Sequence, residues 1–181
     1  KKSGDDAAWQ SKLKQAIGKF LGGLSMLPAP RLGAIAIAEA VRRAGVSSDA
    51  IDEVIMGNVL STGLGQAPAR QAALHAGLPP TVAAVTVNKV CGSGLKAVML
   101  ADQAIRSGDA EIVVAGGMEN MSQTPFILPG ARAGWKLGDR TAIDSIMHDG
   151  LWCSFENQAM GSEANYIAKS RDVSRADQDA F

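Results

Sequence analysis

The chain has 181 residues, of which 46% are apolar, 20% are charged and only 4% are aromatic, and its formal net charge is zero. This composition is that of a folded globular protein and excludes an intrinsically disordered chain. The balanced charge, without a lysine- or arginine-rich block, gives no electrostatic basis for binding nucleic acid or an anionic membrane surface. No apolar run approaches the roughly 20 residues of a membrane span, and no secretory leader is visible, so we expect a cytoplasmic protein.

The chain has two cysteines, Cys91 and Cys153, and two histidines, His75 and His148. The cysteines stand far apart without a CxxC spacing, which argues against a zinc site and against a disulfide-rich fold. We therefore expect no bound metal and no cofactor. The scarcity of histidine also limits any chemistry that needs an imidazole base.

Helices and strands are expected to alternate along the first two thirds of the chain. Apolar spacing and flanking Gly and Pro residues predict a short helix at 12–20, a helix at 32–44, a strand at 51–60, a helix at 67–76, a buried strand at 82–90, a helix at 95–107 and a second buried strand at 111–115. This alternation indicates an α/β fold with βαβ units and a mainly parallel sheet.

The pattern loosens after residue 122 into an extended region rich in Pro and Gly. Helical segments are predicted to return near 142–148 and 160–169. A capped helix is predicted to begin at Ser174. We therefore expect a second region, less regular than the first, over residues 122–181.

Cys91 stands where the second predicted strand passes into a helix through Gly92 and Gly94. A sharp turn there lifts the sulfur clear of the sheet, as strand–nucleophile–helix turns do for serine. Free N–H groups at the helix start favour the reactive thiolate and can stabilise an oxygen that becomes negative when a thioester carbonyl is attacked. The position predicts a nucleophile, although a cysteine after an apolar strand is also commonly a small buried hydrophobe.

The residues after Cys91 allow a second interpretation. Gly92-Ser93-Gly94-Leu95-Lys96-Ala97 fits the G-x-G-x-x-A pattern of a dinucleotide-binding turn. That motif calls for an acidic residue at the end of the next strand to bind a ribose, whereas the chain has no carboxylate there before Glu119. A dinucleotide-binding (Rossmann) domain is therefore the weaker alternative.

Two long motifs resemble the thiolase family: Asn88-Lys89-Val90-Cys91-Gly92-Ser93-Gly94-Leu95-Lys96-Ala97 and Ala115-Gly116-Gly117-Met118-Glu119-Asn120-Met121-Ser122. Shorter matches are Ile17-Gly18-Lys19-Phe20, Gly57-Asn58-Val59-Leu60, Pro68-Ala69-Arg70-Gln71-Ala72 and Asp149-Gly150-Leu151. The Lys-Val-Cys-Gly-Ser-Gly form is more similar to the biosynthetic members, the acetyl-CoA acetyltransferases, than to the long-chain degradative ones.

The resemblance implies a layered αβα fold and Claisen chemistry between CoA thioesters. Cys91 would take an acetyl group from acetyl-CoA, and a second acetyl-CoA, deprotonated at its methyl carbon, would attack that thioester to give acetoacetyl-CoA; the reverse reaction is thiolysis. CoA is thus a substrate and not a resident cofactor. Leu151 and Met160 match positions along the CoA path, with plain core packing as their alternative role. Family members are homo-oligomers, dimers or tetramers.

Three features depart from the family pattern. Residues 1–15 lack the apolar opening strand, which we expect in the middle of the sheet, so the domain at 16–121 is expected to have an incomplete sheet. The position before Met160, usually histidine, is Ala159. The His, Asn and second Cys of the family's C-terminal domain have no match here. We therefore expect a truncated N-terminal half that is inactive or strongly impaired, with a non-catalytic CoA-binding or orphan fragment as the alternative.

Overall fold

The computed structural model describes residues 18–181, so the helix expected at 12–20 falls almost wholly outside the described residues. The chain divides into two compact units, Lys1–Pro125 and Phe126–Phe181. In the part that the structure describes, no helix is long and apolar enough to cross a membrane.

The first unit alternates helices and strands, as the sequence predicts. Its elements are α1 (Ala29–Ala44), β1 (Glu53–Gly57), α2 (Pro68–His75), β2 (Ala83–Val87), α3 (Ser93–Ser107) and β3 (Val113–Gly117), with 3-10 turns at Ser48–Ala50 and Met121–Gln123. Helix α1 begins three residues earlier than predicted because Pro30 occupies the first turn, where its missing N–H leaves no hydrogen bond unmade.

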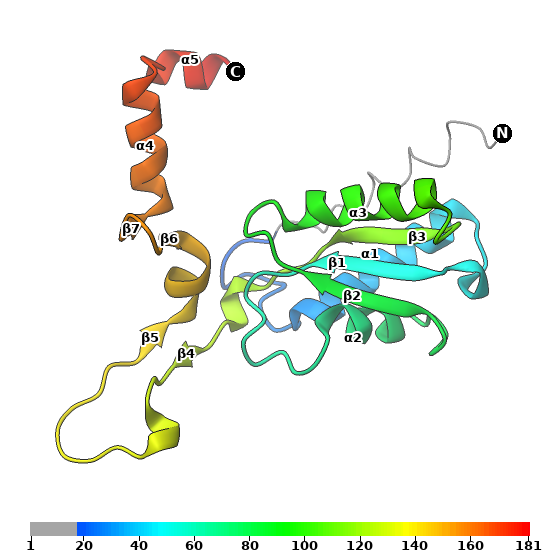
Figure 1. Cartoon of the computed structure of the whole chain (residues 1–181), viewed down its shortest axis with the longest axis horizontal. Helices are drawn as coiled ribbons and strands as arrows, with labels where there is room; N and C mark the ends of the chain where they lie inside the picture. Colours follow the sequence, from blue (N-terminus) through cyan, green and yellow to red (C-terminus); the bar gives the residue numbers. More distant parts are fainter. Residues whose placement is uncertain (1–17) are drawn as a thin grey trace. The chain divides into compact units, whose positions relative to one another are not determined.

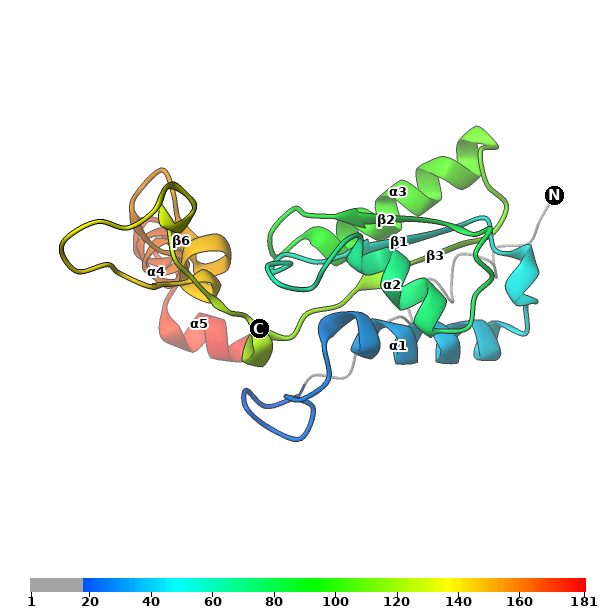
Figure 2. The same cartoon turned by 90° about the horizontal axis from the view of Figure 1, so that it is seen from below.

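The three strands form one parallel sheet in the order β2-β1-β3. Helices α1 and α2 cover one face of this sheet and α3 covers the other, which gives three layers (Figures 1 and 2). Gly57, Val87 and Gly117 are register partners at the ends of the strands, so all three strands finish at the same edge. The α/β class and the layered arrangement are confirmed.

Side chains of the central strand alternate between the two helical layers. Val54 and Met56 of β1 pack in the core cluster of α1 and α2, whereas Ile55 packs with Ala97 and Ala101 of α3. Successive side chains of a strand point to opposite faces of the sheet, so a strand covered by helices on both faces buries apolar residues at every position. Alanines on the α3 side let this helix approach the sheet closely.

The prediction that 82–90 is a buried strand is wrong. β2 covers only Ala83–Val87 and is exposed or half-buried along its length, with Val85 40% exposed. The reason is its place at one side of the described sheet, where only β1 pairs with it. β1 in turn pairs directly with both neighbours, so no gap is left between the three strands, and any further strand of this sheet would pair outside them.

Thr86 ties β2 to the start of α2. The N–H of Ala69, a fully buried residue in the first turn of α2, donates to Thr86 Oγ1 over 3.0 Å. Thr86→Val keeps the side-chain shape and removes the acceptor, so the free energy of unfolding should fall by about 1–2 kcal/mol, measured by urea denaturation. Thr81→Val, at an exposed position before the same strand, should change it by less than about 0.5 kcal/mol. Equal losses in the two variants would contradict the role of Thr86.

The second unit is built from short elements. They are β4 (Phe126–Ile127) and β5 (Ile143–Asp144), antiparallel to each other, a 3-10 turn at Ala131–Ala133, a π-helical turn at Met147–Leu151, β6 (Trp152–Cys153) and β7 (Gln158–Ala159), also antiparallel, α4 (Met160–Ser170) and α5 (Arg175–Ala180).

Two of the three helical predictions in the second unit are confirmed in full and the third in part. α4 matches the predicted 160–169, and α5 begins with a capping box in which Ser174 and Asp177 each accept from the other's backbone N–H. The helical segment predicted near 142–148 is confirmed only from residue 145 onward, because residues 145–146 are α-helical and continue into the π-helical turn, whereas Ile143–Asp144 form β5. Asp144 Oδ1 accepts from the N–H of Ile146, and this local side-chain turn separates β5 from the helical residues that follow.

Candidate active site at the turn before helix α3

Cys91 lies in the junction between the end of β2 at Val87 and the start of α3 at Ser93. Its side chain is exposed, so it is not the small buried hydrophobe of the alternative interpretation. Among the described residues the thiol has no hydrogen-bond partner. The sulfur is therefore open to a large substrate, and no described side chain is in place to take its proton.

The residue before Cys91 has an unusual backbone. Val90 has φ +47°, in the left-handed region that β-branched residues rarely adopt. Its N–H donates to Asn88 Oδ1 over 2.9 Å, and its carbonyl oxygen accepts from Ser93 Oγ over 2.6 Å. The strained residue is thus held from both sides, which turns the chain sharply at the cysteine.

Ser93 closes this turn. Its side chain is buried at 4% exposure, and Oγ accepts from the N–H of Lys89 over 2.8 Å while donating to Val90. Ser93 therefore links the residues on both sides of Cys91.

Ser93→Ala should lower the free energy of unfolding by about 1–2 kcal/mol, because a polar backbone group loses its partner and the strain at Val90 is no longer offset. Urea denaturation measures the loss. Ser107→Ala, at the exposed other end of α3, is the matched control and should change stability by under about 0.5 kcal/mol. If the Ser93→Ala protein is as stable as the Ser107→Ala control, the turn does not depend on the hydroxyl of Ser93.

Three glycines let the first turn of α3 rest on the strand ends. A Cβ at Gly57 would stand 2.6 Å from the carbonyl carbon of Ser93 and 2.7 Å from the nitrogen of Gly94. A Cβ at Gly117 would stand 3.5 Å from the Cα of Gly94. The ends of β1 and β3 at Gly57 and Gly117 thus form a floor on which the first turn of α3 packs. The position of this floor determines how far the start of α3, and with it Cys91, stands from the sheet.

The N–H groups closest to Cys91 are not free, contrary to the expectation of an oxyanion-binding helix start. The N–H of Gly92 donates to the carbonyl of Lys89, and that of Ser93 donates to the carbonyl of Val90. Both bonds belong to the tight turn. The donors for a developing oxyanion must therefore lie elsewhere than on Gly92 and Ser93.

Glu119 follows β3 and turns back toward the end of β1. Its carboxylate accepts from the N–H groups of Val59 and Leu60, at 2.8 and 3.1 Å, and from Asn58 Nδ2 at 2.7 Å. Burial raises the pKa of Glu119, and the three donors only partly offset this effect. A carboxylate used in this way does not serve as the ribose-binding acid of a dinucleotide site.

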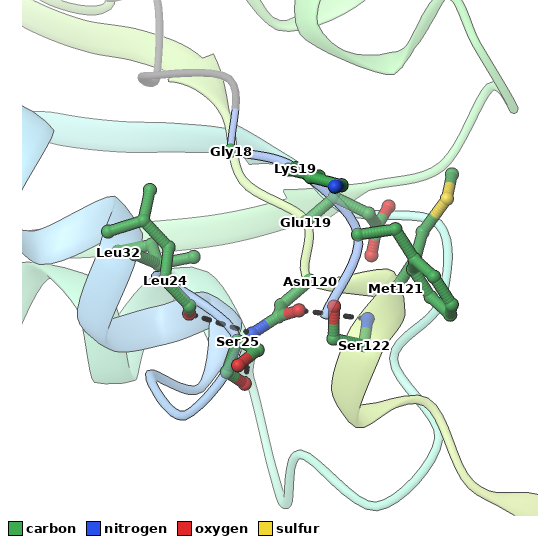
Figure 3. A pocket seen from close by; sticks show the side chains of 10 residues that line it. Gly18, Lys19, Leu24, Ser25, Leu32, Glu119, Asn120, Met121 and Ser122 are labelled. Carbon is green, nitrogen blue, oxygen red and sulfur yellow. Dashed lines mark hydrogen bonds between the residues drawn. The ribbon is translucent and has the colours of Figure 1, made fainter. Parts of the chain in front are cut away.

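Asn120 holds the segment that precedes α1. Its Nδ2 donates to the carbonyls of Leu24 and Ser25, and its Oδ1 accepts from the N–H of Ser122 (Figure 3). The same Nδ2 also donates to the carbonyl of Leu27. Beside it lies a cavity of about 350 Å³. The residues that line the cavity are Gly18, Lys19, Phe20, Leu24, Ser25, Leu32, Glu119, Asn120, Met121 and Ser122.

Leu151 and Met160 belong to the second unit. Leu151 ends the π-helical turn and Met160 begins α4, and the side chains are 36% and 42% exposed. Trp152 and Ala159 are register partners in the antiparallel pair β6–β7. Leu151 directly precedes β6 and Met160 directly follows β7, so the two residues predicted along the CoA path flank the same hairpin in the chain.

Cys153, the second cysteine, also lies in this hairpin. Its sulfur accepts from the N–H of Glu156 at 3.5 Å. Over residues 18–181, no group of three His, Cys, Asp or Glu side chains gathers in a way that could hold a metal ion.

Asn58, Glu119 and Ser93 did not emerge from the sequence as site residues. All three lie within the motifs that resemble the family, so a signal was present. Their roles depend on contacts across about 60 positions of chain for Asn58 and Glu119, and on a strained turn for Ser93. Spacing in the sequence does not reveal either.

Comparison with known proteins identifies the family of the chain. Residues 11–181 match the family "Thiolase, N-terminal domain". The chain is 54% identical over 176 residues to an acetyl-CoA acetyltransferase of Cupriavidus necator, covering 97% of this chain and 45% of the relative. It is 51% identical over 168 residues to an acetyl-CoA acetyltransferase of Pseudomonas aeruginosa, covering 93% and 43%. A cytosolic acetyl-CoA acetyltransferase of Gibberella zeae is 52% identical over 171 residues, covering 94% and 43%.

The chain spans less than half the length of these curated relatives. The family match extends over all of the described residues and includes both units. It leaves the dinucleotide-binding alternative without support. The chain belongs to the thiolase family and carries that family's N-terminal domain.

Proposed function

We propose that this chain supplies the nucleophile of an acyltransferase that moves an acetyl group between CoA thioesters. The observation that carries the proposal is the exposed thiol of Cys91 on a strained turn, in a member of the thiolase family. The printed names of the relatives, acetyl-CoA acetyltransferases, support acetyl as the transferred group.

In the proposed first step the Cys91 sulfur attacks the carbonyl carbon of acetyl-CoA. A new carbon–sulfur bond forms, the bond to the CoA sulfur breaks, and the thiol proton ends on the departing CoA. In the second step the carbanion of another acetyl-CoA attacks the acetyl-Cys91 carbonyl; a carbon–carbon bond forms, the bond to the Cys91 sulfur breaks, and acetoacetyl-CoA leaves. The proton removed from the methyl carbon of acetyl-CoA balances the released thiolate and restores the thiol. The side chains of Leu151 and Met160, which flank the β6–β7 hairpin in the chain, are proposed to line the path of the CoA arm.

The described residues supply the nucleophile but no hydrogen-bonded base for it. Groups that act as a unit in catalysis lose most of the rate acceleration when one is missing. We therefore propose that the isolated chain forms acetyl-Cys91 slowly and turns over acetoacetyl-CoA poorly. Thiolysis at the rate of a full-length relative would overturn this part of the proposal.

The decisive experiment is to incubate the protein with acetyl-CoA and locate the acetyl group by peptide mass spectrometry. One acetyl group on Cys91, removed again by added CoA, is the expected result. Acetylation of Cys153 alone would contradict the assignment. Calorimetric binding of CoA without any acetylated Cys91 would favour the non-catalytic CoA-binding fragment instead.

We also propose that the chain associates with a second copy of itself and acts in the cytoplasm. Exposed apolar side chains of β2 and α3, namely Val85, Leu95 and Met99, support the self-association. The cytosolic relative from Gibberella zeae supports the location. Sedimentation velocity tests the first point, and a strictly monomeric protein at high concentration would contradict it.

A further inference from the structure

The side chain of Glu119, which follows β3, binds the residues that follow β1. Its Oε2 binds the N–H of Val59, and its Oε1 binds the N–H of Leu60 and the amide of Asn58. We propose that Glu119 is a positioning residue for Cys91, acting through the floor on which the first turn of α3 rests. The inference rests on the proposed function, because it assigns Glu119 to the acetyl-transfer site.

The path from Glu119 to the cysteine turn runs through residues 57 and 58. Asn58 donates from Nδ2 to the carbonyl of Met118 at 3.1 Å, and its backbone N–H donates to the carbonyl of Val87 at 3.0 Å. The carbonyl of Gly57 accepts from the N–H of Met118 at 2.9 Å. This pair of residues is thereby fixed to both neighbouring strands, β2 and β3.

Gly57 is also the residue in closest approach to the start of α3. The space where its Cβ would stand is occupied by backbone atoms of Ser93 and Gly94. Ser93 in turn holds the strained turn that contains Cys91. A shift at the end of β1 therefore moves the helix start, because packed backbone cannot absorb a displacement without a rearrangement.

The use of a carboxylate at this position is costly for a purely structural loop contact. Burial disfavours its charged form, and three donors must converge on it. Asn58 is buried, with 2% of its surface exposed. Among the described residues its Oδ1 has no hydrogen-bond partner, so hydrogen bonds from Nδ2 alone fix the side-chain amide. Such an arrangement gives a fixed geometry at the expense of stability, which is typical of groups that support a reactive site.

The opposite end of the same two strands provides a matched control. Asp52, just before β1, accepts from the N–H groups of Glu111 and Ile112, at 2.7 and 2.9 Å, just before β3. These bonds hold the pKa of Asp52 below its usual range. Asp52 and Glu119 thus make the same kind of link between β1 and β3, but only Glu119 makes it at the edge that carries Cys91.

The test compares Glu119→Gln with Asp52→Asn in a Cys153→Ala background, where Cys91 is the one remaining cysteine. Cys91 is labelled with bromotrifluoroacetone and observed by fluorine NMR below the melting temperature. In parallel, the rate of acetylation by acetyl-CoA is measured. A glutamine turns an amide N–H₂ toward backbone donors, so it cannot satisfy all three donors of Glu119.

Glu119→Gln is expected to shift the fluorine resonance and to slow acetylation about tenfold to a hundredfold, because a displacement of the order of 1 Å at a reacting atom has such an effect. Asp52→Asn is expected to lower the melting temperature while leaving the resonance and the rate unchanged. An unchanged resonance and rate in Glu119→Gln, or equal changes in both variants, would overturn the proposal.

Two further measurements keep the outcomes distinct. If Glu119→Gln does not fold, the variant Asn58→Ala replaces it in the experiment. Asn58→Ala removes the side-chain donor and leaves the two backbone donors in place. The same shift of the fluorine resonance is expected, and an unchanged resonance would again overturn the proposal. If the parent protein forms no acetyl-Cys91, the proposed function fails, whereas the fluorine resonance still decides whether Glu119 positions Cys91.

Discussion

Cys91→Ala is expected to abolish acetyl transfer from acetyl-CoA while leaving the fold intact. The thiol is the proposed point of attachment, and a methyl group cannot form a thioester. The side chain is exposed and has no hydrogen-bond partner among the described residues, so its loss should change the free energy of unfolding by under about 0.5 kcal/mol. Acetyl incorporation by mass spectrometry and urea denaturation measure the two effects separately.

The second cysteine provides the control for this prediction. Cys153 is half-buried, and its sulfur accepts one weak hydrogen bond from a backbone N–H. Cys153→Ala should retain the acetylation of Cys91 at the rate of the parent protein. If Cys91→Ala still takes up one acetyl group, the nucleophile lies elsewhere; if both variants lose acetylation together, the transfer is not localised at Cys91.

Gly57→Ala is expected to be the most destabilising small substitution in the first unit. The added methyl would stand 2.6–2.7 Å from backbone atoms of Ser93 and Gly94, which cannot rotate away as a flexible side chain can. Relief requires the start of α3 to move, at a cost of about 3 kcal/mol. Urea denaturation should show this loss, and acetylation of Cys91 should slow even under conditions where the protein remains folded.

Gly94→Ala tests whether the effect comes from the contact or merely from replacing a glycine near the site. A Cβ at Gly94 would stand 3.8 Å from the nitrogen of Gly117, which is ordinary van der Waals contact. Alanine also favours the helix relative to glycine by up to about 1 kcal/mol. Stability should therefore be unchanged or slightly raised. A loss at position 94 as large as that at position 57 would contradict the floor described above.

The sequence predicts the first unit well because its signals are local. Apolar periodicity and Gly or Pro punctuation predict all three helices and all three strands between residues 29 and 117, with errors of a few residues at their ends. The capping box at Ser174 is predicted for the same reason, since its two partners lie within one turn. The exposure of β2 is missed because apolar composition cannot tell a central strand from one at the side of a sheet.

The candidate site is likewise predicted where its signals are local and missed where they depend on contacts between distant parts of the chain. Cys91 is predicted because the strand–Cys–Gly–x–Gly–helix order is visible along the chain. Glu119 accepts hydrogen bonds from the side chain of Asn58 and from the next two backbone N–H groups, those of Val59 and Leu60. These residues lie about 60 positions from Glu119 in the chain, and only the pairing of β1 with β3 brings them together. Likewise, the left-handed Val90 contradicts the local preference of a β-branched residue, so no propensity predicts it.

The hairpin of β6 and β7 has a consequence for how the second unit tolerates changes in length. Leu151 directly precedes β6 and Met160 directly follows β7, and the two strands pair through Trp152 with Ala159 and Cys153 with Gln158. Inserting one residue between 153 and 158 and shifting the pairing by one would change how Leu151 and Met160 are placed relative to each other. The number of residues in this turn is therefore as much a determinant of the proposed CoA path as the two side chains, and length variants there should change CoA affinity more than substitutions do.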